Sequence, residues 1–346
     1  MRRTNVKRLR LEPLRELMAT LGQNAYRAEQ IFQWIWQKNA TDFSEMTNIT
    51  KAFRNYLSRT FTMQGLQKHT VKTALDGSQK YVFKTSDSKY VESVFIPEGK
   101  RKTVCVSTQI GCPVQCAFCA TGRMKFSRNL KAHEIADQVR IVQQHTSTKV
   151  TNVVFMGMGE PLLNLQETLG AIEINSSPIG LSISQRHTTI STVGILQGMQ
   201  TLLNAPLKAK LAISLNFADE NIRNEMIPVA KKNPLREVLQ IAKEYSRTRS
   251  LVTFEYVMIK NLNDRLRDAR LLMSLLKGIP AKINLIPYNE HPLLPYKRPS
   301  DERIKTFYDY LLNAPQTVTL RKSRGQEIQA GCGQLAVLHA QRKKRK

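Results

Sequence analysis

The most informative stretch of this chain is GCPVQCAFCATG, residues 111–122. Three of the five cysteines of the chain lie within eight residues here, in the spacing C-x3-C-x2-C. Thiolates are soft ligands that favour zinc or iron–sulfur clusters, and three of them on short connectors leave a fourth coordination position open. The stretch therefore predicts a metal centre with one position available to another ligand.

Length and cysteine content indicate a cytoplasmic protein with reduced thiols. The chain has 346 residues, enough for one large domain with a small one or for two medium ones. Five cysteines are too few and too unevenly placed for a disulfide framework. No apolar run approaches the roughly 20 residues that a membrane span needs, and no apolar segment of a signal peptide follows the basic N-terminus.

The charge of the chain indicates a polyanionic partner. Lys and Arg number 53 against 27 Asp and Glu, which gives a net charge of +26, and both ends of the chain are basic. A solvated basic surface is the plainer explanation, but an excess of this size is typical of nucleic-acid binders. No basic amphipathic helix with a broad aromatic face supports membrane binding instead.

Residues 1–70 predict a small helical accessory domain. A run of apolar residues at helical spacing ends at Gly22, and glycine is typical of a helix C-cap. Two further amphipathic segments cover 26–38 and 42–61. The exposed Lys and Arg residues of these helices suit contact with RNA. Packing against the main domain alone explains the pattern equally well.

A β-rich extension is predicted over residues 71–100. Asp76-Gly77 separates two strand-like runs, 71–74 and 80–84, as in a β-hairpin. A further strand over 90–96 carries Glu92 within an otherwise apolar run.

Residues 101–337 predict an α/β barrel core. Apolar strand-like runs alternate with helical patterns, as expected for a parallel sheet covered by helices. Six units can be counted, which favours a partial (β/α)6 barrel of the TIM type over a closed eight-fold one. The expected strands are 104–110, 152–156, 187–192, 210–215, 251–259 and 282–287, and the expected helices are 132–144, 162–174, 235–247, 265–276 and 301–312. A basic tail, 338–346, follows the core.

Polar residues and glycines follow these predicted strands, where parallel α/β folds carry their chemistry. Each has a plain explanation as a turn or helix-cap residue, but together they predict a polar ring above an apolar barrel, suited to a cofactor. They are GMGEP at 157–161, Ser191-Thr192, Ser214-Leu215-Asn216 and Asn289.

These motifs resemble the radical S-adenosylmethionine (SAM) enzymes, in which three thiolates hold a 4Fe-4S cluster and SAM binds its fourth iron. Over about residues 10–337 the sequence is similar, more narrowly, to the RlmN/Cfr family of RNA adenine methyltransferases. The motifs that carry this resemblance are VESVFIPE, CATG, FMGMGEPLLN, STVG, NLIPYN and AGCGQLA. GMGEP favours the RlmN branch, which methylates C2 of an adenine in 23S rRNA and in some tRNAs, over the Cfr-like branch, which modifies C8.

The resemblance implies roles for the thiols. Cys112, Cys116 and Cys119 match the cluster ligands. One SAM would methylate Cys332, and a second would be cleaved to a radical that activates this methyl group for addition to adenine. Cys105 would then release the product through a transient disulfide with Cys332, and Glu92 would accept the ring proton. An external electron donor, flavodoxin- or ferredoxin-like, is implied. From spacing alone, a pair of buried structural thiols is the less favoured alternative for Cys105 and Cys332.

The resemblance also implies a set of SAM contacts. Asn216 departs from the family, which has His there, so it keeps a hydrogen-bonding side chain but cannot titrate near neutral pH. His291 and the prolines after it are expected on a surface loop without a catalytic role. The residues that match SAM contacts are Gly159, Glu160, Ser191, Ser214, Leu215 and Asn289, and Asn216 is expected to keep its contact with SAM through altered geometry.

Two other functions fit the same residues. One is a zinc-binding RNA adaptor without catalysis, in which Cys105 or Cys332 supplies the fourth ligand. The other is a radical SAM enzyme with a different substrate, which would keep the cluster but need no methylated Cys332.

Overall fold

The computed structural model describes residues 3–337 and is built around one 10-stranded sheet. The strands follow one another across the sheet in the order β14-β13-β12-β11-β10-β9-β6-β5-β4-β3. Their bounds are β3 Gln67–Thr73, β4 Gln79–Lys84, β5 Tyr90–Glu98, β6 Arg101–Cys105, β9 Asn152–Phe155, β10 Thr188–Thr192, β11 Lys210–Ser214, β12 Val252–Met258, β13 Ala281–Pro287 and β14 Thr317–Leu320.

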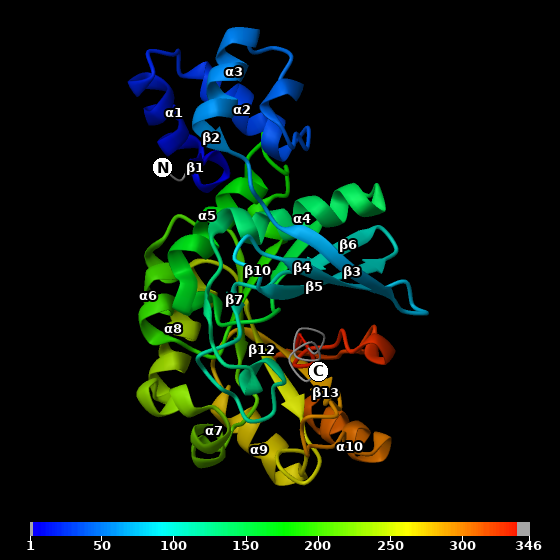
Figure 1. The fold of residues 1–346 in the computed structure, drawn as a ribbon. Coiled ribbons are helices and arrows are strands. Elements are labelled where there is room, and N and C mark those ends of the chain that lie inside the picture. The colour runs from blue at the N-terminus through cyan, green and yellow to red at the C-terminus, as the bar shows by residue number, and fades with distance from the viewer. Residues whose placement is uncertain (1–2, 338–346) are drawn as a thin grey trace.

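The seven strands from β6 to β14 form an open parallel barrel with helices outside it (Figure 1). Apart from β14, these strands are largely buried, inside the barrel and beneath the helices, which explains the apolar runs of β9, β11, β12 and β13. Because β14 and β3 are the two edges of the sheet, the barrel does not close. The predicted partial (β/α)6 barrel is confirmed. Its helices are α4 Ala132–Thr146, α5 Leu165–Ser176, α6 Leu196–Asn204, α7 Glu220–Met226, α8 Leu235–Thr248, α9 Leu266–Leu275 and α10 Asp301–Leu311.

Three elements of the barrel are absent from the predicted set: α6, α7 and β14. The last strand, β14, has four residues of which only Val318 is buried, so it lacks the apolar run by which the other strands are recognised. The predicted strand 104–110 is also corrected. It ends at Cys105, and Gln109–Ile110 (β7) pairs instead with Arg128–Asn129 (β8). Between Cys105 and Gln109, the side chain of Gln138 accepts the N–H of Ser107 and donates to its C=O, so Ser107 does not pair with a neighbouring strand.

The predicted hairpin forms the antiparallel extension β3–β4–β5, which joins the barrel at β6. Gly77 has a φ of 80°, the left-handed conformation that its turn requires. Cys105 lies opposite Val94 in the β5–β6 ladder. The extension thus continues the barrel sheet beyond the strand that carries Cys105.

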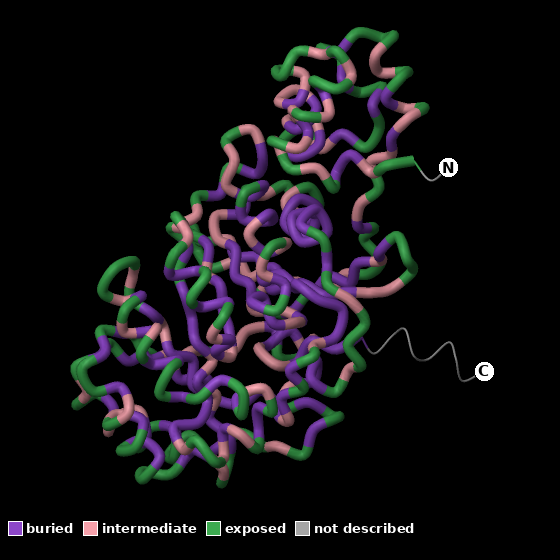
Figure 2. The backbone as a smooth tube through the Cα atoms, turned by 90° about the vertical axis from the view of Figure 1, so that its left-hand side faces the viewer, coloured by how far each residue is buried: buried purple, intermediate pink, exposed green. Residues whose placement is uncertain are grey.

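The N-terminal unit is helical, with its own buried centre in Figure 2. The predicted third helix over 42–61 is wrong in its first half, because a short 3-10 turn is capped there by Asp42 and the chain then folds inward to bury Met46 and Ile49. The helix begins only at Lys51. The elements of this unit are β1 Thr4–Asn5, η1 Val6–Arg8, α1 Leu11–Thr20, α2 Tyr26–Trp36, η2 Phe43–Glu45, α3 Lys51–Thr60 and β2 Phe61–Thr62.

The domain boundaries at 70, 100 and 337 stay predictions, and the predicted basic tail, 338–346, lies outside the described residues. No helix among residues 3–337 is both long and apolar enough to cross a bilayer.

A buried ion pair joins the N-terminal unit to the barrel. Lys7 Nζ lies 2.5 Å and 2.6 Å from the two carboxylate oxygens of Asp137 on α4, and Arg140 Nε donates to the same carboxylate at 2.8 Å. The N–H of Leu66 completes the arrangement at 3.1 Å. Burial alone would raise the pKa of Asp137, but the charges and hydrogen bonds of Lys7 and Arg140 lower it to about 2.

We expect Asp137→Asn to lower the free energy of unfolding by roughly 3–5 kcal/mol, because it leaves Lys7 and Arg140 buried without a counter-charge. Urea unfolding measures the change. The wild-type contribution should be complete above the unfolded pKa near 3.9 and be lost as the pH falls towards 2, because the folded pKa is the lower one.

Glu173→Gln is the matched control, because Arg10 and Glu173 also join the two units but are about half exposed. It should cost under about 1 kcal/mol. Equal effects of the two substitutions would contradict a special role for the buried pair.

Candidate active site

The cysteine loop runs from β7 to β8 and is shaped by close backbone approaches. A Cβ on Gly111 would lie 2.5 Å from the carbonyl oxygen of Lys125, and one on Gly122 would lie 2.5 Å from that of Cys116. Gly111 also has a φ of 74°. These glycines are therefore required by space and not only by flexibility.

Two distant segments hold the loop in place. The Ala117 N–H donates to Met226 O at 2.9 Å, and the Ala120 N–H donates to Gly333 O at 2.8 Å. The Thr121 hydroxyl donates to Leu335 O at 2.6 Å. The loop is thus bonded directly to the C-terminal segment that carries Cys332.

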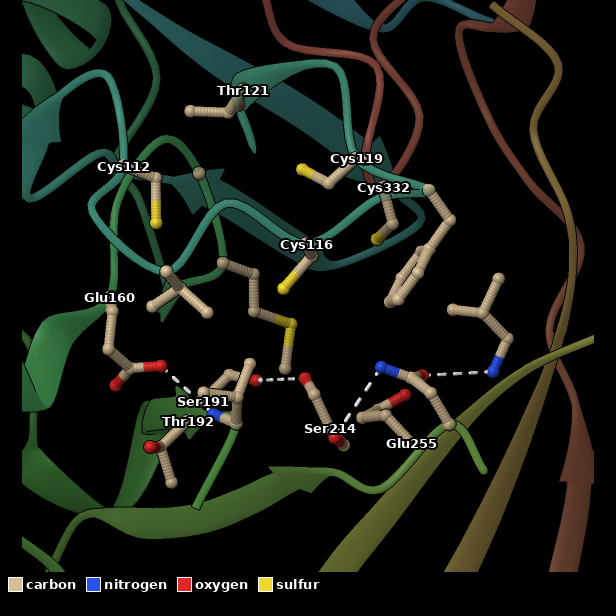
Figure 3. Close-up of a pocket in the computed structure, with 18 of the residues that line it drawn as sticks. Cys112, Cys116, Cys119, Thr121, Glu160, Ser191, Thr192, Ser214, Glu255 and Cys332 are labelled. Carbon is tan, nitrogen blue, oxygen red and sulfur yellow. Dashed lines mark hydrogen bonds between the residues drawn. The ribbon is translucent and has the colours of Figure 1, made fainter. Parts of the chain in front are cut away.

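The three thiols of the loop face one pocket from the same wall (Figure 3). Burial raises the pKa of each of these thiols, that of Cys112 to about 12. Thiolates in so apolar a place need a positive partner, which bound iron supplies. Among the described residues no three Cys, His, Asp or Glu side chains gather around a single ion. Three thiols on one wall of a pocket suit an iron–sulfur cluster that takes one thiolate per iron.

Glu160 lies across the pocket from the thiols, in the loop after β9. Its carboxylate is buried and accepts the N–H groups of Leu162 and Val193, both at 2.9 Å. Burial raises its pKa to about 7 although both hydrogen bonds favour the charged form. Gly159 has a φ of 100°, and a Cβ there would lie 2.6 Å from Gln109 Cβ. This turn is what directs Glu160 into the pocket.

Two neighbouring strand ends supply hydroxyl groups to the same pocket. Ser191 Oγ on β10 and Ser214 Oγ on β11 are 3.3 Å apart. Asn216 also lines the pocket, in a left-handed conformation with a φ of 57°. Its Oδ1 accepts the Val257 N–H at 3.1 Å, so the side chain joins β11 to β12.

The strand-end residues do not all meet in one cavity as the sequence predicts. Leu215 is fully buried and does not line the pocket, but its carbonyl accepts a hydrogen bond from the buried Arg223. Asn289 lines a neighbouring cavity instead, where its Nδ2 donates to Cys332 O at 3.2 Å.

Cys332 lines both cavities, whereas Cys105, at the end of β6, lines only the second. Both thiols are free. Burial, and then the neighbouring Cys332, raise the pKa of Cys105 to about 12. A Cβ on Gly331 would lie 2.8 Å from the amide of Asn289, so this glycine permits close packing beside Cys332. Gly333 has a φ of 79°, a left-handed conformation that favours glycine.

Glu92 is not placed with these residues. It is 1% exposed on β5, 3.7 Å from Lys80 Nζ, and lines neither cavity. One carboxylate oxygen has no hydrogen-bond partner, and burial raises its pKa despite Lys80. His291, predicted on a surface loop, is also buried, at 3% exposure. Its Nδ1 accepts the Leu293 N–H at 3.2 Å, which folds this loop onto the core.

Three polar residues in and beside the site were not predicted from the sequence. Glu255 on β12 lines the pocket and accepts a hydrogen bond from Asn284 at 2.6 Å, and a lone carboxylate in an apolar strand was the available signal. Arg321 lines both cavities but follows β14, the strand that was not predicted. Arg223 donates to Val193 O at 2.5 Å and to Leu215 O, and thereby ties two strand-end loops together.

Comparison with known proteins identifies the family. Residues 4–63 match the family described as the ribosomal RNA large subunit methyltransferase N-terminal domain, and residues 106–272 match the radical SAM superfamily. The chain is 41% identical over 336 residues to the dual-specificity RNA methyltransferase RlmN of Geotalea uraniireducens, covering 97% of each chain. It is 44% identical over 352 residues to a probable RlmN of Chloroherpeton thalassium, covering 98% of this chain and 95% of that one.

A solved structure supports the same relationship. The crystal structure of a radical SAM methyltransferase from Sphaerobacter thermophilus superposes with a TM-score of 0.91 at 36% identity, covering 96% of this chain and 98% of that one. These relationships exclude the alternative of a zinc-binding adaptor without catalysis. The chain belongs to the RlmN family of radical SAM RNA methyltransferases.

Proposed function

We propose that this chain methylates C2 of an adenine in 23S rRNA and in tRNA, with Cys332 as the carrier of the methyl group. The observation that carries the proposal is the place of Cys332, which lines both the pocket of the cysteine loop and the cavity that contains Cys105. A thiol at this junction can receive a methyl group from one side and present it to RNA on the other. The names of the relatives, dual-specificity RNA methyltransferases, support the two classes of RNA.

The first pocket suits a cluster and SAM. Cys112, Cys116 and Cys119 would hold the 4Fe-4S cluster, which with bound SAM supplies a 5'-deoxyadenosyl radical. Glu160 would meet the amino group of SAM, and the hydroxyls of Ser191 and Ser214 its ribose or carboxylate. The pocket has about 940 Å³ of empty space including its mouth.

The thiol chemistry needs both distant cysteines. The sulfur of Cys332 would take the methyl carbon of one SAM, and the bond from that carbon to the sulfonium breaks with its electron pair left on S-adenosylhomocysteine. A second SAM is consumed when the methyl group is activated. An external electron donor, flavodoxin- or ferredoxin-like, would supply the electron for this second cleavage. After the carbon has bonded to adenine, deprotonated Cys105 would attack the sulfur of Cys332: the sulfur–sulfur bond forms, the sulfur–carbon bond breaks with its electron pair left on the carbon, and that carbon takes up a proton to become the methyl group. An external thiol reductant must then reopen the disulfide.

The ring proton would be taken by Glu92, whose carboxylate has one oxygen without a partner and a raised pKa. The segment of residues 329–336 lies over this part of the extension, where Lys80 Nζ bonds Gln329 O at 3.3 Å. For Glu92 to reach the adenine, this segment would have to shift when RNA binds.

We expect anaerobic reconstitution to yield a brown protein with about four iron and four sulfide ions per chain. Iron and sulfide analysis with visible absorption measures this. Cys116→Ala should lose most of the iron, whereas Cys105→Ala, a thiol outside the loop, should keep it. A colourless protein that binds zinc and no iron would overturn the cluster.

Replacing the two distant thiols should give different failures. Cys332→Ala should abolish RNA methylation, because the methyl carrier is lost. Cys105→Ala should stall as a covalent protein–RNA adduct, visible on a denaturing gel, because nothing cleaves the bond to Cys332. Full activity of the Cys332 variant would rule out the carrier.

The position of methylation needs a separate measurement. Mass spectrometry of nucleosides from RNA treated with the enzyme should find 2-methyladenosine. Finding 8-methyladenosine instead would move the chain to the Cfr-like reaction while leaving the thiol chemistry intact.

A further inference from the structure

A buried arginine lies behind the cysteine loop and outside both cavities. Arg223, on the short helix α7 (Figure 1), is 1% exposed and is one of the largest fully buried side chains of the described chain. It lines neither the pocket of the cysteine loop nor the second cavity. It therefore does not contact a ligand in either place, and its charge can act on the site only through space.

The hydrogen bonds of this guanidinium all go to uncharged groups. Nη1 donates to Leu215 O and, at 3.3 Å, to Ser214 O, and Nη2 donates to Val193 O at 2.5 Å. Nε is buried and has no hydrogen-bond partner. Carbonyl groups orient the guanidinium but leave its charge uncompensated, and no carboxylate of residues 3–337 lies within ion-pair distance of it.

The other buried lysine and arginine side chains of residues 3–337 each have a carboxylate. Lys7 and Arg140 share Asp137, at 2.5 Å and 2.8 Å, and Lys80 lies 3.7 Å from Glu92. Pairing of this kind is the rule in protein interiors, because a buried charge without a counter-charge is costly. The exception on α7 indicates a counter-charge that a bound group supplies.

The ionisable groups nearest to Arg223 indicate where that bound group lies. Burial lowers the pKa of Arg223 to about 10, and Cys116, followed by Glu220, acts in the opposite direction. Glu220 is exposed, so water screens its charge. Cys116 is buried and packs with Met226 of α7 in one group of apolar side chains, and the Ala117 N–H donates to Met226 O at 2.9 Å. Helix α7 thus lies directly behind the middle thiol of the cysteine loop.

We propose that Arg223 is the buried counter-charge of the cluster and makes its one-electron reduction easier. The inference rests on the proposed function, which places a 4Fe-4S cluster on Cys112, Cys116 and Cys119. A cluster held by three thiolates is negative overall, and accepting an electron adds one more negative charge. A buried cation nearby stabilises the reduced form more than the oxidised form, because water does not screen the stronger attraction.

This role concerns the step that the external electron donor performs. A donor of the flavodoxin or ferredoxin class gives up one electron, the cluster accepts it, and no proton needs to move. The potential of an iron–sulfur cluster depends on its net charge, its hydrogen bonds and its burial. A fixed positive charge behind the thiols is one means of bringing this potential within reach of the donor. Arg223 contacts no reacting atom and acts only through the charge of the cluster.

The test removes the charge of Arg223 and measures the potential of the cluster. Anaerobically reconstituted protein is titrated reductively without SAM or RNA, and the reduced cluster is followed by electron paramagnetic resonance. In Arg223→Gln we expect the equilibrium constant of one-electron reduction to fall about tenfold, which lowers the potential by about 59 mV. Replacement of Arg223 by citrulline, a neutral isostere that keeps the shape and most of the donors, should give the same shift. This second variant keeps the test valid if the glutamine variant does not fold.

Two further variants separate the charge from the hydrogen bonds. Arg223→Lys keeps the charge but loses the planar fork that bonds several carbonyls, so its equilibrium constant should stay within about threefold of the wild type. Arg249→Gln is the matched control. Arg249 also donates to a carbonyl, Leu203 O, at 2.7 Å, but it is exposed and follows α8 at the opposite end of the barrel. Its loss should leave the potential unchanged.

An unchanged potential in the neutral variants would overturn the inference. So would a fall in Arg223→Lys as large as that in Arg223→Gln, because the carbonyl bonds would then explain the effect. The iron content of the wild type keeps this inference apart from the proposed function. A wild-type protein without iron would overturn the proposed function, whereas a wild-type cluster whose potential does not respond to the charge of residue 223 would overturn this inference alone.

Discussion

Two hydrogen bonds between distant segments carry the arrangement of this site. The Ala120 N–H bonds Gly333 O, and the Thr121 hydroxyl bonds Leu335 O, so the loop with the three thiols and the segment with Cys332 are one unit. Each segment has only one short 3-10 turn, Thr121–Arg123 or Gln326–Ile328, to hold its shape. Buried hydrogen bonds to backbone carbonyls replace it, and breaking one would leave an acceptor unsatisfied away from water. The position of Cys332 relative to the cysteine loop depends on these two hydrogen bonds.

The β3–β5 extension has a structural task in the same arrangement. Its hairpin turn holds the C-terminal segment at two points, because Asp76 accepts the Gly325 N–H at 2.9 Å and Glu327 accepts the Leu75 N–H at 2.7 Å. Arg324 adds its bonds to the end of β5. The extension therefore sets where the segment crosses the open edge of the barrel. An accessory element thus decides the shape of both cavities.

Local sequence patterns were enough to predict the barrel. Its strands are apolar on both faces and alternate with amphipathic helices, so each unit is visible within about 30 residues. Short or exposed elements were not predicted, because β14 has only one buried residue and α7 has seven residues in all. Arg321 was not predicted as a site residue because it directly follows β14. The third N-terminal helix was overextended, because burial of Met46 and Ile49 interrupts a pattern that is helical on both sides.

By itself the sequence determined the chemistry available: three thiols at cluster spacing, a glycine-rich turn before Glu160, and hydroxyl groups at the ends of β10 and β11. These depend on spacing within a few residues, and the structure brings them to one pocket. Only the tertiary structure decided that Asn289 and Cys105 line a second cavity and that Cys332 lines both cavities. It also decided that Glu92 lines neither cavity. Those positions follow from contacts such as that of Thr121 with Leu335, 214 residues apart, which no local pattern records.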